Sequence, residues 1–130
     1  MRYDLPMRSS ILGILALLVA ISLAAQVRTV TRVGIVAKPR SYSGPCPVTL
    51  QFIGTIHVRR YPVWVEYEWE RSDGARGRRE RVEITSAGRG VSDTWRLGAG
   101  RQRMKVWERL HVLAPTGISS PAARVTVNCR

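Results

Sequence analysis

The chain has 130 residues, of which 45% are hydrophobic and 23% are charged. This composition excludes disorder throughout the chain and leaves room for one ordinary globular domain. The 21 Lys and Arg residues outnumber the 9 Asp and Glu residues, which gives a formal net charge of +12. Lys38 and Lys105 are the only lysines, but this arginine bias assigns no function by itself, because the base composition of a genome can produce it.

The first 25 residues have the order of features that is typical of an export signal. Arg2 and Arg8 form a positive n-region, an apolar run covers Ile11–Leu23, and Ala24 and Ala25 supply small residues for cleavage. We therefore expect an exported protein, periplasmic, extracellular or at the cell surface, that is cleaved after one of these two alanines. The alternative is an uncleaved membrane anchor, although an apolar run of about 15 residues is shorter than the ~20 that usually span a bilayer.

The sequence after the signal predicts strands separated by turns, with no helical periodicity. Val27–Ala37 mixes β-branched residues with single arginines, as edge strands do, and residues 38–47 read as a linker or loop rich in Pro, Ser and Gly. Gly54 predicts a bulge or a bend in the strand that follows. Six further strands are expected at Cys46–Val58, Val63–Arg71, Arg78–Thr85, Val91–Leu97, Arg103–Leu113 and Ala122–Cys129.

This series of short strands predicts an all-β fold. The expected architecture is an immunoglobulin-like sandwich of about seven antiparallel strands, preceded by an N-terminal signal or anchor helix. The domain organisation is then a signal peptide or anchor at residues 1–25, an edge strand and linker at 26–45, and the sandwich domain at 46–130.

The segment Val63–Arg71 shows the clearest alternation of apolar and polar residues. Its apolar side chains are expected to face the core and its glutamates to face solvent. The glutamates form a row of like charge that would either bind a cation or, in the interpretation we favour, remain a solvated face that arginines neutralise across strands. The two faces consist of Val63, Val65, Tyr67 and Trp69 on one side and Glu66, Glu68 and Glu70 on the other.

The two cysteines lie near the two ends of the predicted sandwich. Cys46 is in phase with the apolar positions of the first core strand, and Cys129 is in phase with those of the last strand. Two cysteines at these positions are compatible with one disulfide or with two free thiols. Export to an oxidising compartment makes the disulfide the expected state.

Three motifs, GPCPVTLQFIGTI, YEWERSDGA and RVTVNC, resemble a group of immunoglobulin-like domains found in exported bacterial proteins. The resemblance covers about residues 44–129 and implies the sandwich fold, which hosts many unrelated functions. Two features depart from antibody domains: the second cysteine lies in the last strand, and Trp69 lies 23 residues past Cys46. The resemblance is therefore to immunoglobulin-like domains rather than to true immunoglobulin domains.

Candidate catalytic residues are few. The only imidazoles are His57 and His111, both expected to be exposed, and neither belongs to a GxSxG, HExxH, CxxC or P-loop pattern. We therefore expect a protein that is not an enzyme, with no catalytic residues, no cofactor and no metal.

Aromatic and cationic residues provide the candidate binding sites. Trp69 and Trp95 are expected in the core, whereas Trp64 and Trp107 fall on the opposite strand faces, where they form an exposed patch or pack under a loop. Two cationic clusters are candidates for anion binding, although such clusters often serve only solubility. They consist of Arg76, Arg78, Arg79 and Arg81, and of Arg101, Arg103 and Lys105.

Two functions from different classes remain. The first is a non-catalytic exported module of the bacterial envelope that binds a protein or serves adhesion. The second is a binder of an anionic envelope polymer or of lipid head groups through the arginine clusters. Nucleic acid is not expected as a partner, because export removes the protein from it, and contact with a membrane is expected only through residues 11–25 if they are not cleaved.

Overall fold

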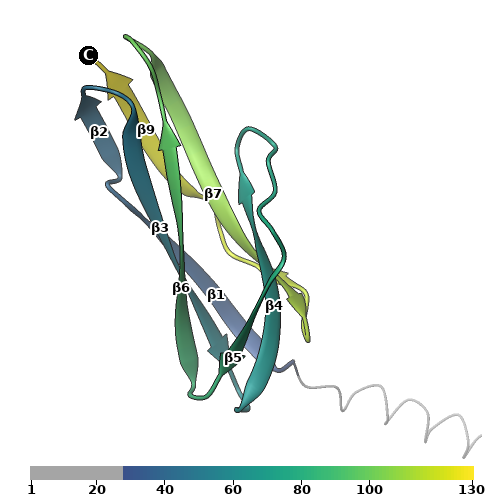
Figure 1. Ribbon diagram of the computed structural model, residues 1–130. Coiled ribbons are helices and arrows are strands. Elements are labelled where there is room, and N and C mark those ends of the chain that lie inside the picture. The colour runs from purple at the N-terminus through teal and green to yellow at the C-terminus, as the bar shows by residue number, and fades with distance from the viewer. Residues whose placement is uncertain (1–27) are drawn as a thin grey trace, which may run out of the picture.

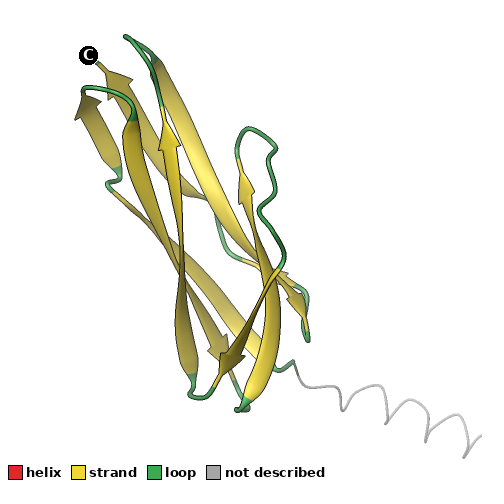
Figure 2. Cartoon of the chain, viewed as in Figure 1, coloured by secondary structure: helices red, strands yellow, loops and turns green. Residues whose placement is uncertain are grey.

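The computed structural model describes residues 28–130, which form two β-sheets packed face to face (Figures 1 and 2). The predicted signal peptide and its cleavage site lie outside the described residues. Among the described residues, no helix has the length and hydropathy needed to cross a membrane.

The smaller sheet has the strand order β1-β3-β6, and both of its pairings are antiparallel. Its strands are rich in β-branched residues, which suit a pleated and half-buried surface. They are β1 (Val30–Lys38), β3 (Val48–Val58) and β6 (Gly88–Leu97).

The larger sheet has the order β2-β9-β7-β4-β5, with β8 added beside β7. Its pairings are antiparallel except for β2 with β9, which run parallel. The strands are β2 (Ser41–Gly44), β4 (Val63–Arg71), β5 (Glu80–Ile84), β7 (Arg103–Ala114), β8 (Ile118–Ser119) and β9 (Ala123–Cys129).

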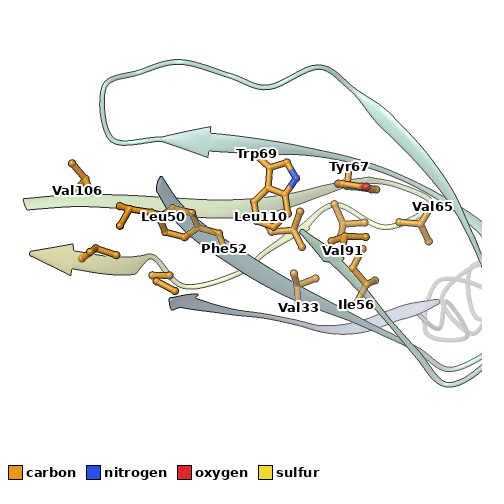
Figure 3. Packing of buried hydrophobic residues seen from close by; sticks show 14 of the residues in the cluster. Val33, Leu50, Phe52, Ile56, Val65, Tyr67, Trp69, Val91, Val106 and Leu110 are labelled. Atoms are coloured by element: carbon orange, nitrogen blue, oxygen red, sulfur yellow. The ribbon is translucent and has the colours of Figure 1, made fainter. Parts of the chain in front are cut away.

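The core lies between the sheets and is made by the inward positions of the alternating strands (Figure 3). The smaller sheet contributes Leu50, Phe52 and Ile56 from β3, all fully buried. The larger sheet contributes Trp69 from β4 and Leu110 from β7 opposite them. Each large apolar side chain buried in this way stabilises the fold by about 1.5–3 kcal/mol before the entropy of ordering is counted. The predicted apolar face of Val63–Arg71 is confirmed, because its alternate residues point into this core.

Gly54 does not produce the bulge or bend that the sequence predicted. The pairing of β3 with β6 continues through it without a shift in register, with Gly54 opposite Val91. The structural reason for a glycine is steric, because a Cβ at this position would collide with Leu110 Cδ2 and lie 3.2 Å from Trp69. Gly54 is therefore a point of close packing between the sheets.

The structure corrects the predicted strand count and the predicted start of the sandwich. Residues 28–130 contain nine strands, because the expected linker at residues 38–47 contains β2 and the expected loop before the last strand contains β8. The segment placed outside the sandwich, residues 26–45, contributes β1 to one sheet and β2 to the other. The sandwich thus begins at Val30 rather than at Cys46.

A disulfide joins Cys46, just before β3, to Cys129 at the end of β9, with a Cα–Cα distance of 5.5 Å. It links the two sheets at the end of the sandwich that also holds the C-terminus (Figure 1). Gly98, at a φ of 93°, lies against this bond, and a Cβ there would sit 2.8 Å from Cys129 Sγ. The turn after β6 therefore requires glycine for both its conformation and the space that the disulfide occupies.

Candidate binding face

The outward positions of β7 and β9 form a continuous cationic surface, which we call the β7–β9 face. On β7, every second residue from Arg103 to Trp107 points outward, and cross-strand pairing sets these residues beside β9. The register places Arg103 beside Asn128, Lys105 beside Thr126 and Trp107 beside Arg124. The face consists of Arg101, Arg103, Lys105, Trp107, Arg124, Thr126, Asn128 and Arg130.

Two hollows lie along this face. One, of about 460 Å³, is lined by Arg101, Arg103 and Arg130 together with Asn128 and Cys129. The other, of about 250 Å³, follows on the same two strands and is lined by Lys105, Val106, Trp107, Arg124, Val125 and Thr126. Together they offer cations and one indole to a ligand extended along the strands.

The charges on this face are not neutralised within the described part of the chain. None of Arg101, Arg103, Lys105 and Arg124 forms an ion pair there. Arg130 donates from Nε to the Ser43 hydroxyl at 2.9 Å, a neutral partner. Because unpaired cations side by side repel one another, an anion bound between them would be favoured electrostatically.

The glutamate row lies on β4, the strand next to β7, and its Glu68 and Glu70 side chains form ion pairs with arginines. Arg76 reaches Glu68 Oε1 at 2.8 Å and Glu70 Oε2 at 2.7 Å, and Arg109 lies 3.9 Å from Glu70 Oε1. Arginines therefore neutralise Glu68 and Glu70, as the interpretation that we favoured from the sequence predicts.

The structure does not bring the first predicted cluster together as one anion site. Arg76 is bound to the glutamate row, and Arg81 stacks over the Trp64 ring with its guanidinium carbon 4.8 Å from the ring centroid. Arg78 and Arg79 are exposed in the segment between β4 and β5. In contrast, the second cluster, Arg101, Arg103 and Lys105, is extended by Arg124 and Arg130 from β9.

The two outward tryptophans occupy different surroundings. Trp64 is 52% exposed at the start of β4. Trp107 is half-buried, with the Arg109 guanidinium 4.8 Å from its ring centroid. Of the two expected core tryptophans, Trp69 is buried, whereas Trp95 is half-buried against the core and lies under Arg71 at 5.0 Å.

Neither histidine is the exposed residue that the sequence suggested. His111 is on the outward face of β7 as expected, but its side chain is only 17% exposed, because Nδ1 contacts the Ser119 hydroxyl and Nε2 lies 3.4 Å from Glu70 Oε1. His57 is half-buried and contacts Arg32 Nη2 through Nε2 at 3.1 Å. Both imidazoles therefore connect neighbouring strands.

Charged residues also meet between the two sheets. Arg71 donates from Nε to Glu108 Oε1 and from Nη2 to Asp93 Oδ2, each at 3.3 Å. Burial and a hydrogen bond with Asp93 raise the pKa of Glu108 to about 8, above its ordinary 4.5. A pKa of about 8 favours the protonated form of Glu108 at neutral pH. This network bridges β4 and β7 of the larger sheet to β6 of the smaller one.

The two packed sheets define an immunoglobulin-like β-sandwich. A solved structure of this kind, the CARDB domain of the PF1109 protein from Pyrococcus furiosus in complex with di-metal ions, aligns with a TM-score of 0.56. The alignment covers 81% of this chain and 100% of that chain at 10% sequence identity, a level at which the likeness shows the fold alone. No protein-family model matches the chain, and no curated protein matches it either.

Within residues 28–130, no three or more His, Cys, Asp or Glu side chains are grouped so that they could hold a metal ion. The described part of this chain thus gives no reason to carry over the metal ions named for the P. furiosus domain.

Proposed function

We propose that the chain is a non-catalytic, exported binding module of the bacterial envelope that holds an anionic partner on its β7–β9 face. The observation that carries the proposal is the set of unpaired cations around Trp107 on two adjacent strands. Arg103 and Lys105 are two residues apart on β7, about 6–7 Å along the strand, a spacing that suits an extended polymer with regularly spaced negative groups.

The indole of Trp107 favours one class of anionic polymer. Trp107 lines the hollow that Lys105 and Arg124 flank, so an apolar surface and two cations meet at one place. Sugar rings pack on aromatic side chains through their apolar faces, and carboxylate or sulfate groups pair with arginine. An acidic polysaccharide would use both features of this hollow.

The test compares two triple variants with the same loss of charge. Arg103→Ser, Lys105→Ser and Arg124→Ser remove cations from the face, whereas Arg78→Ser, Arg79→Ser and Arg81→Ser remove three from the segment around β5. Binding of the full chain to a polyuronate is measured over a range of salt concentrations. The first triple variant should reduce the slope of log affinity against log salt by about two to three. Each contact between a cation of the protein and an anionic group of the polymer contributes about one to this slope. Equal slopes for both variants would contradict the proposed face.

A protein partner is the second candidate, and the outer face of the smaller sheet favours it. Val36 is 44% exposed there, and the register sets it in a row with Ile53 and Ser92. Charge is depleted in this row, as it is at the centres of protein interfaces. Capture of an envelope protein that persists at high salt and is lost in Val36→Asp would support this candidate over the polymer.

A further inference from the structure

One end of the sandwich is where the described chain begins, and we call it the entry end. Arg59 N donates to Thr29 O at 2.9 Å, which sets the turn after β3 beside the start of β1. Val58 N donates to Ala87 O at 2.9 Å, which adds the turn between β5 and β6. Figure 1 shows the described chain starting at this end and finishing at the opposite one.

The entry end is cationic and contains no acidic residue in its loops. The turn after β7 also lies at this end, since Val30 N donates to the Thr116 hydroxyl at 3.5 Å. Segments 28–32, 57–62, 85–89 and 115–117 include neither Asp nor Glu. The arginines that they contain are all exposed, and none of their side-chain hydrogen bonds within residues 28–130 goes to a carboxylate: Arg32 contacts the His57 ring, and Arg89 donates to the Glu83 carbonyl. These arginines are Arg28, Arg32, Arg59, Arg60 and Arg89.

Two large aromatic side chains are exposed beside these arginines. Tyr61 lies in the turn between β3 and β4 and is 53% exposed, and Trp64, 52% exposed, follows three residues later. Exposed apolar side chains point to a binding surface when they are grouped rather than scattered singly. Tyrosine and tryptophan have an apolar ring and a polar group, and they are the residues enriched where proteins meet membrane head groups.

The apolar run of the sequence lies close to the entry end along the chain. Ile11–Leu23 is followed by only four residues before Arg28. Four residues span at most about 14 Å even when extended. While this run is held in a bilayer, as an export signal or as an anchor, the entry end is therefore within reach of the head groups.

We propose that the entry end docks on the surface of an anionic lipid bilayer, with its arginines on lipid phosphates and with Tyr61 and Trp64 in the interfacial region. Charge complementarity, the two exposed aromatic residues and the place where the described chain begins all support this partner. The proposal does not depend on the β7–β9 face. Along the strands, Trp107 lies nine residues from Trp64, about 30 Å at the usual strand rise, so docking leaves that face toward the aqueous side.

The experiment places the full chain in nanodiscs that contain brominated lipids and measures the quenching of tryptophan fluorescence. One set of discs contains phosphatidylcholine alone, and the other contains phosphatidylcholine with 30% phosphatidylglycerol. Quenching is expected to be stronger in the anionic discs, to disappear in Trp64→Phe and to remain in Trp107→Phe. Raising the salt concentration should reduce the quenching in the wild-type chain, because salt screens the contacts between arginines and lipid phosphates. This comparison tests the electrostatic contribution without a variant.

Two double variants with equal loss of charge complete the test. Arg59→Ser with Arg60→Ser should lower the docking constant about 25-fold, since each arginine near an anionic surface contributes about fivefold. Arg101→Ser with Arg103→Ser, at the opposite end, should leave it unchanged. Docking is ruled out if Trp64 is not quenched in the anionic discs, if quenching is equal in both lipids, or if the two double variants behave alike.

Discussion

Gly54 shows at the scale of one residue how closely the sheets pack. Gly54→Ala should lower the free energy of unfolding by about 1–3 kcal/mol, because an added methyl group must displace Leu110 in a filled core. Gly34→Ala is the matched control, since a Cβ at Gly34 in β1 meets no atom within 4 Å. Urea unfolding of both variants measures the difference. Equal stabilities would show that the core at Gly54 has room to adjust.

Glu108 predicts a dependence of stability on pH. Its pKa is about 8 in the native state and near 4.5 when unfolded, so between these values the native state holds a proton that the unfolded state has lost. Stability from this group is fully present below pH 4.5 and is lost as the pH rises through about 8, with a slope of up to ~1.4 kcal/mol per pH unit. Glu108→Gln keeps the shape and removes this titration.

The measurement is urea unfolding of the wild type and Glu108→Gln from pH 5 to pH 9. The wild type should lose stability relative to the variant as the pH rises. Asp93 and Arg71 are the charged groups that act on the Glu108 pKa, so Asp93→Asn should weaken the effect by removing the negative charge that raises this pKa. Parallel pH profiles for the wild type and Glu108→Gln would contradict the assigned proton.

Part of this network could be seen in the sequence. Glu108 lies in phase with Val106 and Leu110, so the alternation already placed an acid among core positions. Asp93 likewise shares its face with Val91 and Trp95. The partner Arg71 could not be predicted, because it depends on the pairing of β4 with β7 and on the packing of β6 of the other sheet, and one-dimensional spacing does not report which strands meet.

At the scale of elements, the strands with the clearest alternation of apolar and polar residues were predicted best. The segment Val63–Arg71 was predicted with its observed bounds, because every second residue is apolar. The two missed strands are short and lack this pattern: β2 is four residues of sequence SYSG, and β8 is two residues. The conformation of β2 is set by pairing with β9, which is distant in the sequence. The conformation of β8 is set by pairing with β7, which precedes it in the chain.

The disulfide connects elements that are far apart in the chain, and its removal should lower stability. Cys46 and Cys129 are 83 residues apart, for which the chain-entropy model gives about 4.5 kcal/mol as an upper figure. Replacing both by alanine should reduce the melting temperature by roughly 10 °C or more, at ~4–8 °C per kcal/mol for a domain of this size. Calorimetry of the oxidised protein and of the variant provides the comparison. Equal melting temperatures would mean that packing alone holds the two sheets together.

At the scale of the whole molecule, the two outer surfaces differ in chemistry. The larger sheet presents unpaired cations on β7 and β9, next to a glutamate row that arginines cover on β4. The smaller sheet presents a row with Val36, Ile53 and Ser92 at its centre.

The candidate binding face was predictable only in part. Arg101, Arg103 and Lys105 are neighbours in sequence and were identified as a cluster. Arg124 and Arg130 join them through the pairing of β9 with β7, which composition does not reveal. Conversely, the cluster from Arg76 to Arg81 is dense in sequence but is dispersed by ion pairing and aromatic stacking. Local charge density therefore located part of one candidate face but did not show that ion pairing and stacking separate the members of the other cluster.

The most direct test of the β7–β9 face is a titration of the isotope-labelled chain with a polyuronate oligomer at low salt, followed by amide NMR. The largest shift changes should fall on Arg103, Lys105, Trp107, Arg124 and Thr126, and the Trp107 indole resonance should move with them. Added salt should reverse these changes, because exposed ion pairs are screened. Changes confined to residues 76–81 or to the outer face of the smaller sheet would contradict the face that the structure favours.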